Sequence, residues 1–121
     1  MATHKDLDVW KESINFVVKI YKFTETFPDD ERFGLISQIR RAAISIPSNI
    51  AEGAARQTNK ENLYFLYVAL GSITELETQL IIAEKLNYLK QNEDYFDWLQ
   101  AIKAKLISYI RYVKSLKPIK I

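Results

Sequence analysis

The chain has 121 residues, of which 48% are apolar, so it is long enough to form one domain with a substantial core. It contains no cysteine and a single histidine, His4, which excludes disulfides and thiolate chemistry and argues against zinc sites and histidine-dependent hydrolases. No cationic segment followed by an apolar run opens the chain, and its apolar runs are far shorter than the roughly 20 residues of a membrane span. We therefore expect a cytoplasmic protein that has no membrane association and needs no metal or cofactor.

Charge is distributed unevenly, although the net charge is only +2. Residues 1–97 carry 11 Lys/Arg and 15 Asp/Glu, whereas residues 98–121 carry six basic residues and no acid. The C-terminal segment is therefore a cationic element attached to an acidic body.

The pattern of apolar residues and helix-stop signals predicts four helices in one domain spanning residues 1–121. Their expected ranges are about 8–26, 31–55, 58–86 and 93–116. An Asp in Pro28–Glu31 begins the second helix, and Thr58 with Glu61 forms a Thr-x-x-Glu capping box for the third. Asn92 or Asp94 caps the fourth. Short connections make neighbouring helices antiparallel, which predicts an all-α, up-down-up-down four-helix bundle.

The second helix contains a proline in its interior, Pro47. An interior proline removes one backbone hydrogen bond and costs about 3 kcal/mol. The apolar spacing nevertheless keeps its phase through Pro47, which predicts one continuous helix with a kink. The residues that carry this spacing are Ile36, Ile39, Ala43, Ile46 and Ile50.

Two of the predicted helices have apolar faces that are too wide for a solitary bundle. The first helix has one stripe at Trp10, Ile14, Val17 and Tyr21, and a second at Val9, Phe16, Ile20, Phe23 and Phe27. The third helix is apolar or aromatic all round at residues 64–68. Because a core-facing stripe needs little more than 100° of a helix, the excess predicts a second buried surface and hence self-association.

Glu77 interrupts the apolar stripe expected for the third helix, and an isolated buried carboxylate is costly. The stripe comprises Leu63, Leu66, Leu70, Ile73, Leu76, Leu80 and Ile81. Counting back from the turn near residues 56–57 places Arg40 and Arg41 at the level of residues 75–77. We therefore predict a partly buried Arg40–Glu77 ion pair, with Arg41 exposed. Glu52 and Arg56 are expected to form a solvated (i, i+4) pair.

No catalytic signature is present. The chain has no glycine-rich phosphate loop, no nucleophile elbow and no Glu-x-x-His metal ligands, and its serines have no histidine base. These observations predict a protein that is not an enzyme. Nucleic acid is the best-supported ligand, because clustered cations and nearby tyrosines in the fourth helix suit phosphates and unpaired bases. The predicted nucleic-acid contacts are Arg41, Arg56, Lys103, Arg111 and Lys114.

Three segments carry a resemblance to a known family. They are Asp6–Ser13, Phe33–Ala43 and Ser45-Ile-Pro-Ser-Asn-Ile-Ala-Glu-Gly53, and Leu70–Leu80 adds a fourth match. Together they resemble the four-helix-bundle proteins of the 23S ribosomal RNA intervening-sequence family. A related branch comprises the accessory variability determinant proteins of diversity-generating retroelements, which bind a reverse transcriptase and RNA.

The resemblance implies a ring-like homopentamer with a link to RNA and no established catalytic residues. Our leading hypothesis is a homo-oligomer that binds RNA or a ribonucleoprotein through a basic surface. One alternative is a protein-interaction scaffold, for instance for a polymerase-type partner, without intrinsic RNA affinity. Another is the product of a selfish or relic element.

Overall fold

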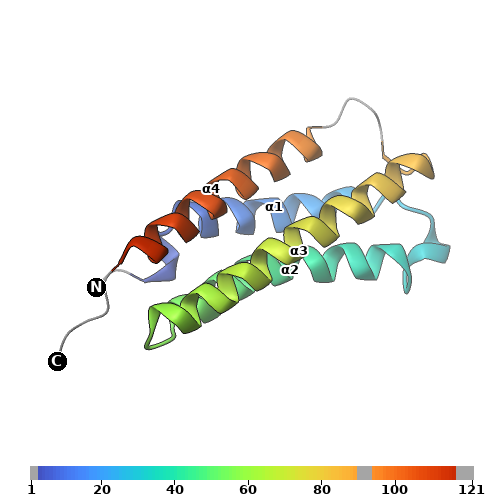
Figure 1. Ribbon diagram of the computed structural model, residues 1–121. Helices are drawn as coiled ribbons and strands as arrows, with labels where there is room; N and C mark the ends of the chain where they lie inside the picture. Colours follow the sequence, from blue (N-terminus) through green and yellow to red (C-terminus); the bar gives the residue numbers. More distant parts are fainter. Residues whose placement is uncertain (1–2, 90–93, 117–121) are drawn as a thin grey trace.

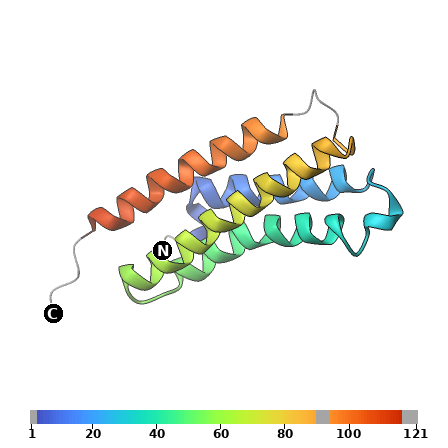
Figure 2. The ribbon, with the colours of Figure 1, turned by 45° about the vertical axis from the view of Figure 1, so that its right-hand side comes forward.

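The computed structural model describes residues 3–89 and 94–116, and within them it contains four α-helices and two short 3-10 turns. The helices are α1 (Asp8–Thr24), α2 (Leu35–Ala54), α3 (Asn59–Lys85) and α4 (Tyr95–Ser115). The 3-10 turns are η1 (His4–Asp6) and η2 (Asp29–Glu31). The helices run alternately up and down, with α2 and α3 side by side and α1 between α2 and α4 (Figures 1 and 2). The fold is therefore the all-α four-helix bundle that the sequence predicts.

The helix ends follow local capping chemistry. Thr58 Oγ1 accepts a hydrogen bond from the backbone N–H of Glu61 at 3.1 Å, so the predicted N-cap of α3 is present. After α3, Asn87 takes a left-handed conformation with φ of 62°, and the N–H of Tyr88 bonds the carbonyl of Ala83 at 2.9 Å. This is the pattern that satisfies the last carbonyls of a helix.

The start of α2 differs from the prediction by four residues. The acidic residues expected to begin this helix form η2 instead, and α2 begins only after Gly34, whose φ and ψ of −111° and −110° are not helical.

The predicted cap of α4 is present by position only. Asp94 is the N-cap residue but its side chain makes no capping hydrogen bond, and Asn92 lies outside the described residues.

Pro47 lies inside α2, which continues through it to Ala54, as predicted from the unbroken apolar phase. The kink itself stays a prediction. Asn49 Nδ2 donates to the carbonyl of Ser45 at 2.8 Å, one turn back. The carbonyl that the proline leaves without its usual donor is that of Ala43, so Asn49 reinforces the neighbouring turn rather than replacing the missing bond.

The core is formed by one face of each helix. The second stripe predicted for α1 is the buried one, whereas Trp10, Ile14, Val17 and Tyr21 lie at the edge of the core or outside it. On α3, Ile81 was predicted to be in the core but is 41% exposed, and Ala69, Ser72, Gln79 and Ala83 are buried instead. Small residues let α3 approach α2 closely, which is why its buried face differs from the stripe of large residues.

Helix α3 is, among the described residues, the one helix whose length and composition would suit a membrane span, with a mean hydropathy of 1.3 over its most apolar window. Its position explains much of this composition, because it packs between α2 and α4 as a core helix of the bundle (Figure 1). Only 39% of that window is buried in the protomer. An outer face of α3 therefore remains apolar; its exposed members are Tyr64, Tyr67, Val68, Ile81, Ile82 and Leu86.

Candidate nucleic-acid interface

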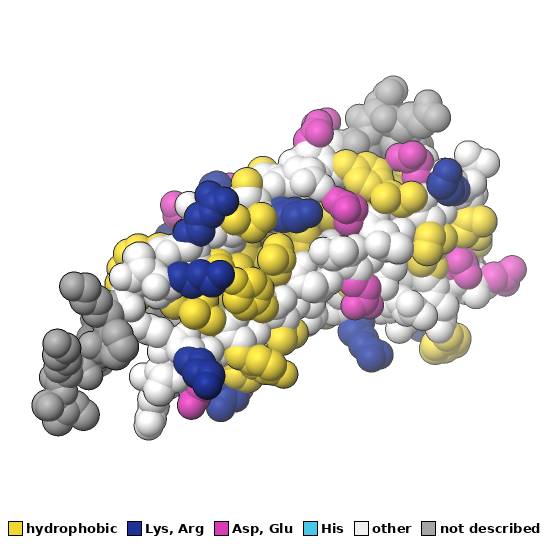
Figure 3. Space-filling model, viewed as in Figure 1, with side chains coloured by type: hydrophobic (Ala, Val, Ile, Leu, Met, Phe, Trp, Pro, Cys, Tyr) yellow, Lys and Arg dark blue, Asp and Glu magenta, His cyan; other side chains and the backbone are white. Residues whose placement is uncertain are grey.

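Cations and aromatic rings alternate at the end of the bundle where α2 ends, α3 begins and α4 ends. The guanidinium of Arg56 lies 4.6 Å from the ring centroid of Phe65, and the amine of Lys114 lies 5.2 Å from that of Tyr67. Arg111 is exposed one turn before Lys114. Figure 3 shows Lys and Arg side chains separated by apolar ones at this end of the molecule. We call this surface the basic–aromatic end; it comprises Arg56, Tyr64, Phe65, Tyr67, Arg111 and Lys114.

The cations at this end differ in whether a carboxylate pairs with them. Arg56 Nη2 pairs with Glu52 Oε1 at 2.5 Å, in the exposed (i, i+4) arrangement that the sequence predicts. The two ion pairs found among the described residues use Arg56 and Lys105, so Arg111 and Lys114 carry charges that no carboxylate neutralises. Both of these side chains are exposed and therefore available to a phosphate.

Two of the five predicted contacts lie elsewhere. Lys103 is half-buried on the flank of α4, 11 residues before Lys114, which corresponds to about 16 Å along a helix. Arg41 is exposed, as predicted, but it precedes Arg56 by 15 residues, or about 22 Å, and borders a different hollow with Arg32 and Phe33. The structure therefore brings Arg56, Arg111 and Lys114 to one end and separates Lys103 and Arg41 from them.

Lys105 shows why counting cations in the C-terminal segment overestimates its free charge. Its amine donates to Glu12 Oε1 of α1 at 2.7 Å. This hydrogen bond and the charge of Glu12 raise the pKa of Lys105 above its ordinary value, while desolvation opposes them. Lys117 and Lys120, the last two cations of the segment, lie outside the described residues.

The predicted Arg40–Glu77 ion pair is wrong. Arg40 Nε donates to Thr24 Oγ1 at 2.9 Å and Arg40 Nη2 donates to the carbonyl of Tyr21 at 3.2 Å. The guanidinium also lies 4.4 Å from the Tyr21 ring centroid. Glu77 instead accepts a hydrogen bond from Gln100 of α4.

The prediction gave Arg40 and Glu77 the correct height along the bundle but assigned the wrong neighbouring helix to each side chain. Ser45 and Ser72 share a hydrogen bond of 2.8 Å between α2 and α3, and Arg40 and Glu77 lie five residues before and five after these two serines. They are therefore at one level, as predicted. Arg40, however, faces α1, where it binds a carbonyl in the last turns of that helix. A cation is favourable there because the helix dipole is negative at its C-terminus.

The Ser-x-Pro-Ser-Asn-x-Ala-Glu-Gly motif has a structural account at three positions. Asn49 Nδ2 donates to Ser45 Oγ at 2.9 Å, and Ser45 Oγ bonds Ser72 of α3, so a polar chain links the helices. Gly53 is needed for close packing: a Cβ there would lie 2.5 Å from Asn62 Oδ1 and 3.0 Å from the Asn62 carbonyl oxygen. Both hydrogen bonds of Asn49 are to Ser45, within α2.

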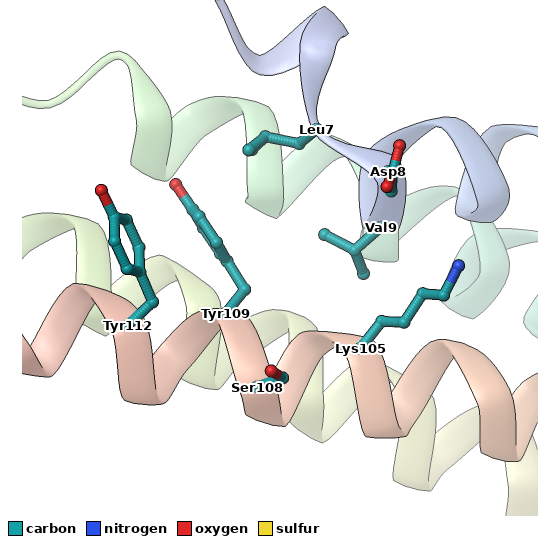
Figure 4. A pocket seen from close by; sticks show the side chains of 7 residues that line it. All are labelled: Leu7, Asp8, Val9, Lys105, Ser108, Tyr109 and Tyr112. Atoms are coloured by element: carbon teal, nitrogen blue, oxygen red, sulfur yellow. The ribbon is translucent and has the colours of Figure 1, made fainter.

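A hollow with an aromatic wall lies between the start of α1 and the last turns of α4. In Figure 4, Tyr109 and Tyr112 of α4 lie side by side and face Leu7 and Val9 of the N-terminal segment. Their ring centroids are 6.2 Å apart with an interplanar angle of 27°. Among the described residues, Lys105 is the one cation that lines this hollow, and it is held by Glu12, so this part of the chain provides stacking surface there without an unpaired cation.

No cluster of three or more His, Cys, Asp or Glu side chains that could hold a metal occurs among residues 3–89 and 94–116. The shifted pKa found in this part of the chain belongs to the surface pair Lys105–Glu12. The site is therefore defined by charge and aromatic surface rather than by acid–base or metal-binding groups.

The fold places the protein among the all-α four-helix bundles. Residues 5–108 match the family model described as 23S rRNA-intervening sequence protein, and the chain belongs to that family. A search of curated proteins finds no match. A similar solved structure is a protein of unknown function from the S23 ribosomal protein family of Bacteroides thetaiotaomicron, with a TM-score of 0.63 and 24% identity over 88% of this chain and 95% of that one. This likeness supports the fold.

Proposed function

We propose that this protein is a non-enzymatic, self-associating bundle that binds RNA or a ribonucleoprotein through its basic–aromatic end. The observation that carries the proposal is the pair of unneutralised cations, Arg111 and Lys114, beside the aromatic run of α3. The description of the family refers to sequences that interrupt 23S ribosomal RNA, which supports RNA as the polymer bound.

The chemistry of this end suits unpaired or structured RNA. Cations neutralise phosphates and release counterions, and exposed rings stack on bases without requiring a particular sequence. Tyr64 is 64% exposed and Tyr67 is 45% exposed, so both present ring surface to solvent. Lys114 already lies against Tyr67, which places a phosphate-binding group and a stacking group within one nucleotide's reach.

Self-association is supported by the apolar surface that one protomer leaves exposed. This apolar surface includes a groove between α1 and α2 and the outer face of α3. A pentamer is the assembly that the family resemblance implies. A closed oligomer would repeat the basic–aromatic end several times around an axis and so strengthen binding to a long polyanion.

Fluorescence anisotropy with labelled structured RNA, single-stranded RNA and duplex DNA tests the proposal, with salt varied from 50 to 200 mM. Two unpaired cations engaged per protomer on a single strand predict a slope of about −1.4 in log K against log salt, or about a sevenfold loss of affinity over this range. The double variant Arg111→Ala/Lys114→Ala removes both cations and should abolish most of this salt dependence. Lys105→Ala, a matched charge removal on the same helix, should leave the slope unchanged because Lys105 is paired with Glu12.

Tyr67→Ala separates stacking from charge. It should weaken binding to single-stranded RNA at every salt concentration while leaving the slope unaltered, since base stacking involves no counterion release. An assembled protein that fails to bind RNA even at 50 mM salt would refute the RNA proposal. A protein partner of polymerase type would then be the function to test.

A further inference from the structure

Phe33 is the most exposed large apolar side chain among the described residues, at 92% of its surface. It lies between η2 and α2, and its one ring contact is with the guanidinium of Arg32, 5.8 Å from the ring centroid. Exposing a whole phenylalanine forfeits one of the largest apolar burial gains available to a side chain. Phe33 is thus a projecting anchor that its own protomer does not cover.

The same chain has an apolar groove between α1 and α2. Its wall residues include Trp10, Ile14, Val17, Val18, Ile44 and Pro47. Val18 is 51% exposed and Ile44 is 41% exposed. The groove continues at Ile44 into the hollow bordered by Tyr21 and Arg41, so one apolar surface extends along the bundle.

Phe33 cannot fill the groove of its own protomer. Pro47, in the groove wall, is 12 residues beyond Leu35, where α2 begins, and this separation corresponds to about 18 Å along the helix axis. Within its own protomer Phe33 borders the adjoining hollow, so the part of the groove around Pro47 is left for the Phe33 side chain of another copy.

Charge complementarity favours a second copy as the occupant. Phe33 directly follows Arg32 and the acidic turn η2, which contributes Asp29, Asp30 and Glu31. The groove is bordered by cations: Lys11 is exposed on the side of α1 that carries Ile14 and Val18, and Arg41 lines the adjoining hollow. A copy that inserts Phe33 would bring its acidic turn against this basic rim.

We propose that Phe33 of one protomer docks in the α1–α2 groove of a second protomer. The inference rests on the self-association part of the proposed function and identifies the surface responsible. It also gives Arg41 a position at a subunit contact rather than at the RNA surface. The basic–aromatic end involves other residues, so it stays open to RNA in the assembly.

The first test compares assembly masses by light scattering. Phe33→Asp removes the anchor and Val18→Glu blocks the groove; both positions are more than half exposed, so the fold should be retained, as circular dichroism would verify. Each variant should have a lower mass than the wild type. Ala104→Glu places an acid at an exposed apolar position on α4, outside both apolar surfaces, and should keep the wild-type mass.

The second test locates the contact, using a chain that has no native cysteine. A mixture of Arg32→Cys and Ser48→Cys proteins keeps both Phe33 and the apolar wall, and a short bis-maleimide should link the two proteins. A mixture of Arg32→Cys and Ala104→Cys, with the second cysteine on the exposed side of α4, should not be linked. Adding Phe33→Asp to the Arg32→Cys protein should abolish the link.

A monomeric wild type, a Phe33→Asp variant of unchanged mass, or absence of the Arg32–Ser48 link would each overturn the docking proposal. RNA binding is measured in parallel on Phe33→Asp. If this variant is monomeric and its RNA binding persists, the docking proposal and the RNA proposal both stand. If the wild type assembles through Phe33 but binds no RNA, only the RNA proposal fails.

Discussion

Arg40 provides the most direct check on how the first two helices are held together. The substitution Arg40→Met keeps the length and much of the apolar stem of the side chain while removing its charge and its donors. It eliminates the bonds to Thr24 Oγ1 and to the Tyr21 carbonyl, at 2.9 and 3.2 Å, together with the contact on the Tyr21 ring. Thr24 itself is fully buried, so it loses a partner that water cannot easily replace.

The magnitude follows from these contacts. A hydrogen bond to a charged group contributes about 1.5–3 kcal/mol. Because Arg40 is only partly buried, solvent competes for its charge and the lower half of that range applies. Its contact with the tyrosine ring adds about 0.5–1 kcal/mol. We therefore expect Arg40→Met to lower the free energy of unfolding by about 2–3 kcal/mol.

A double-mutant cycle distinguishes the observed contact from the ion pair predicted from the sequence. Arg40→Met combined with Thr24→Val should show a coupling of about 1 kcal/mol or more, whereas Arg40→Met with Glu77→Gln should be additive to within about 0.5 kcal/mol. Urea unfolding at one fixed protein concentration measures each variant, since assembly makes apparent stability depend on concentration. Arg111→Met, an exposed arginine substitution without an ion-pair partner among the described residues, is the matched control.

The reasoning would be refuted if Arg40→Met unfolded like the Arg111→Met control. It would also be refuted if the coupling appeared with Glu77 and not with Thr24, because the contact that positions Arg40 would then be the one predicted from helix counting.

Two further perturbations follow from individual contacts. Gly53→Ala should lower the free energy of unfolding by about 1–3 kcal/mol because its Cβ would meet the Asn62 backbone, whereas Gly71→Ala, with open space around it, should raise it by about 0.5–1 kcal/mol; thermal melts of both variants measure the difference in sign. Glu12→Gln should lower the pKa of Lys105, followed by NMR titration of its side chain; because the folded-state pKa is raised, the contribution of this pair to stability is present below the ordinary lysine pKa and is lost as the pH rises through the folded value.

The sequence was sufficient for the fold because helix periodicity and capping are local. Pro47 could be placed inside a continuous helix, since the apolar phase on either side of it matched. The level of Arg40 relative to Glu77 was also correct, because residue count fixes height along antiparallel helices. What counting cannot fix is which neighbour a flanking side chain faces, since a residue beside the core stripe can point toward either adjacent helix.

The candidate site was less predictable for the same reason. Lys114 and Arg56 were identified by their charge, but their contacts with Tyr67 and Phe65 depend on how the end of α4 and the end of α2 approach α3. The pairing of Lys105, one of the six basic residues counted in the C-terminal segment, could not be foreseen because its partner, Glu12, is 93 residues away in the sequence. Phe33 could have been suspected from its position between an acidic turn and a glycine, where no apolar periodicity accounts for a phenylalanine.

The polar and apolar residues in the second half of α2 lie on different sides of the helix. Ser45, Asn49 and Gly53 recur every four residues and face α3, where small and hydrogen-bonded side chains allow close approach. Pro47 and Ile44 fall on the α1 side and line the apolar groove. Pro47 is buried, so the packing of its ring offsets part of the helix stability that a proline costs, and the same residue lines the groove in which we propose that Phe33 docks.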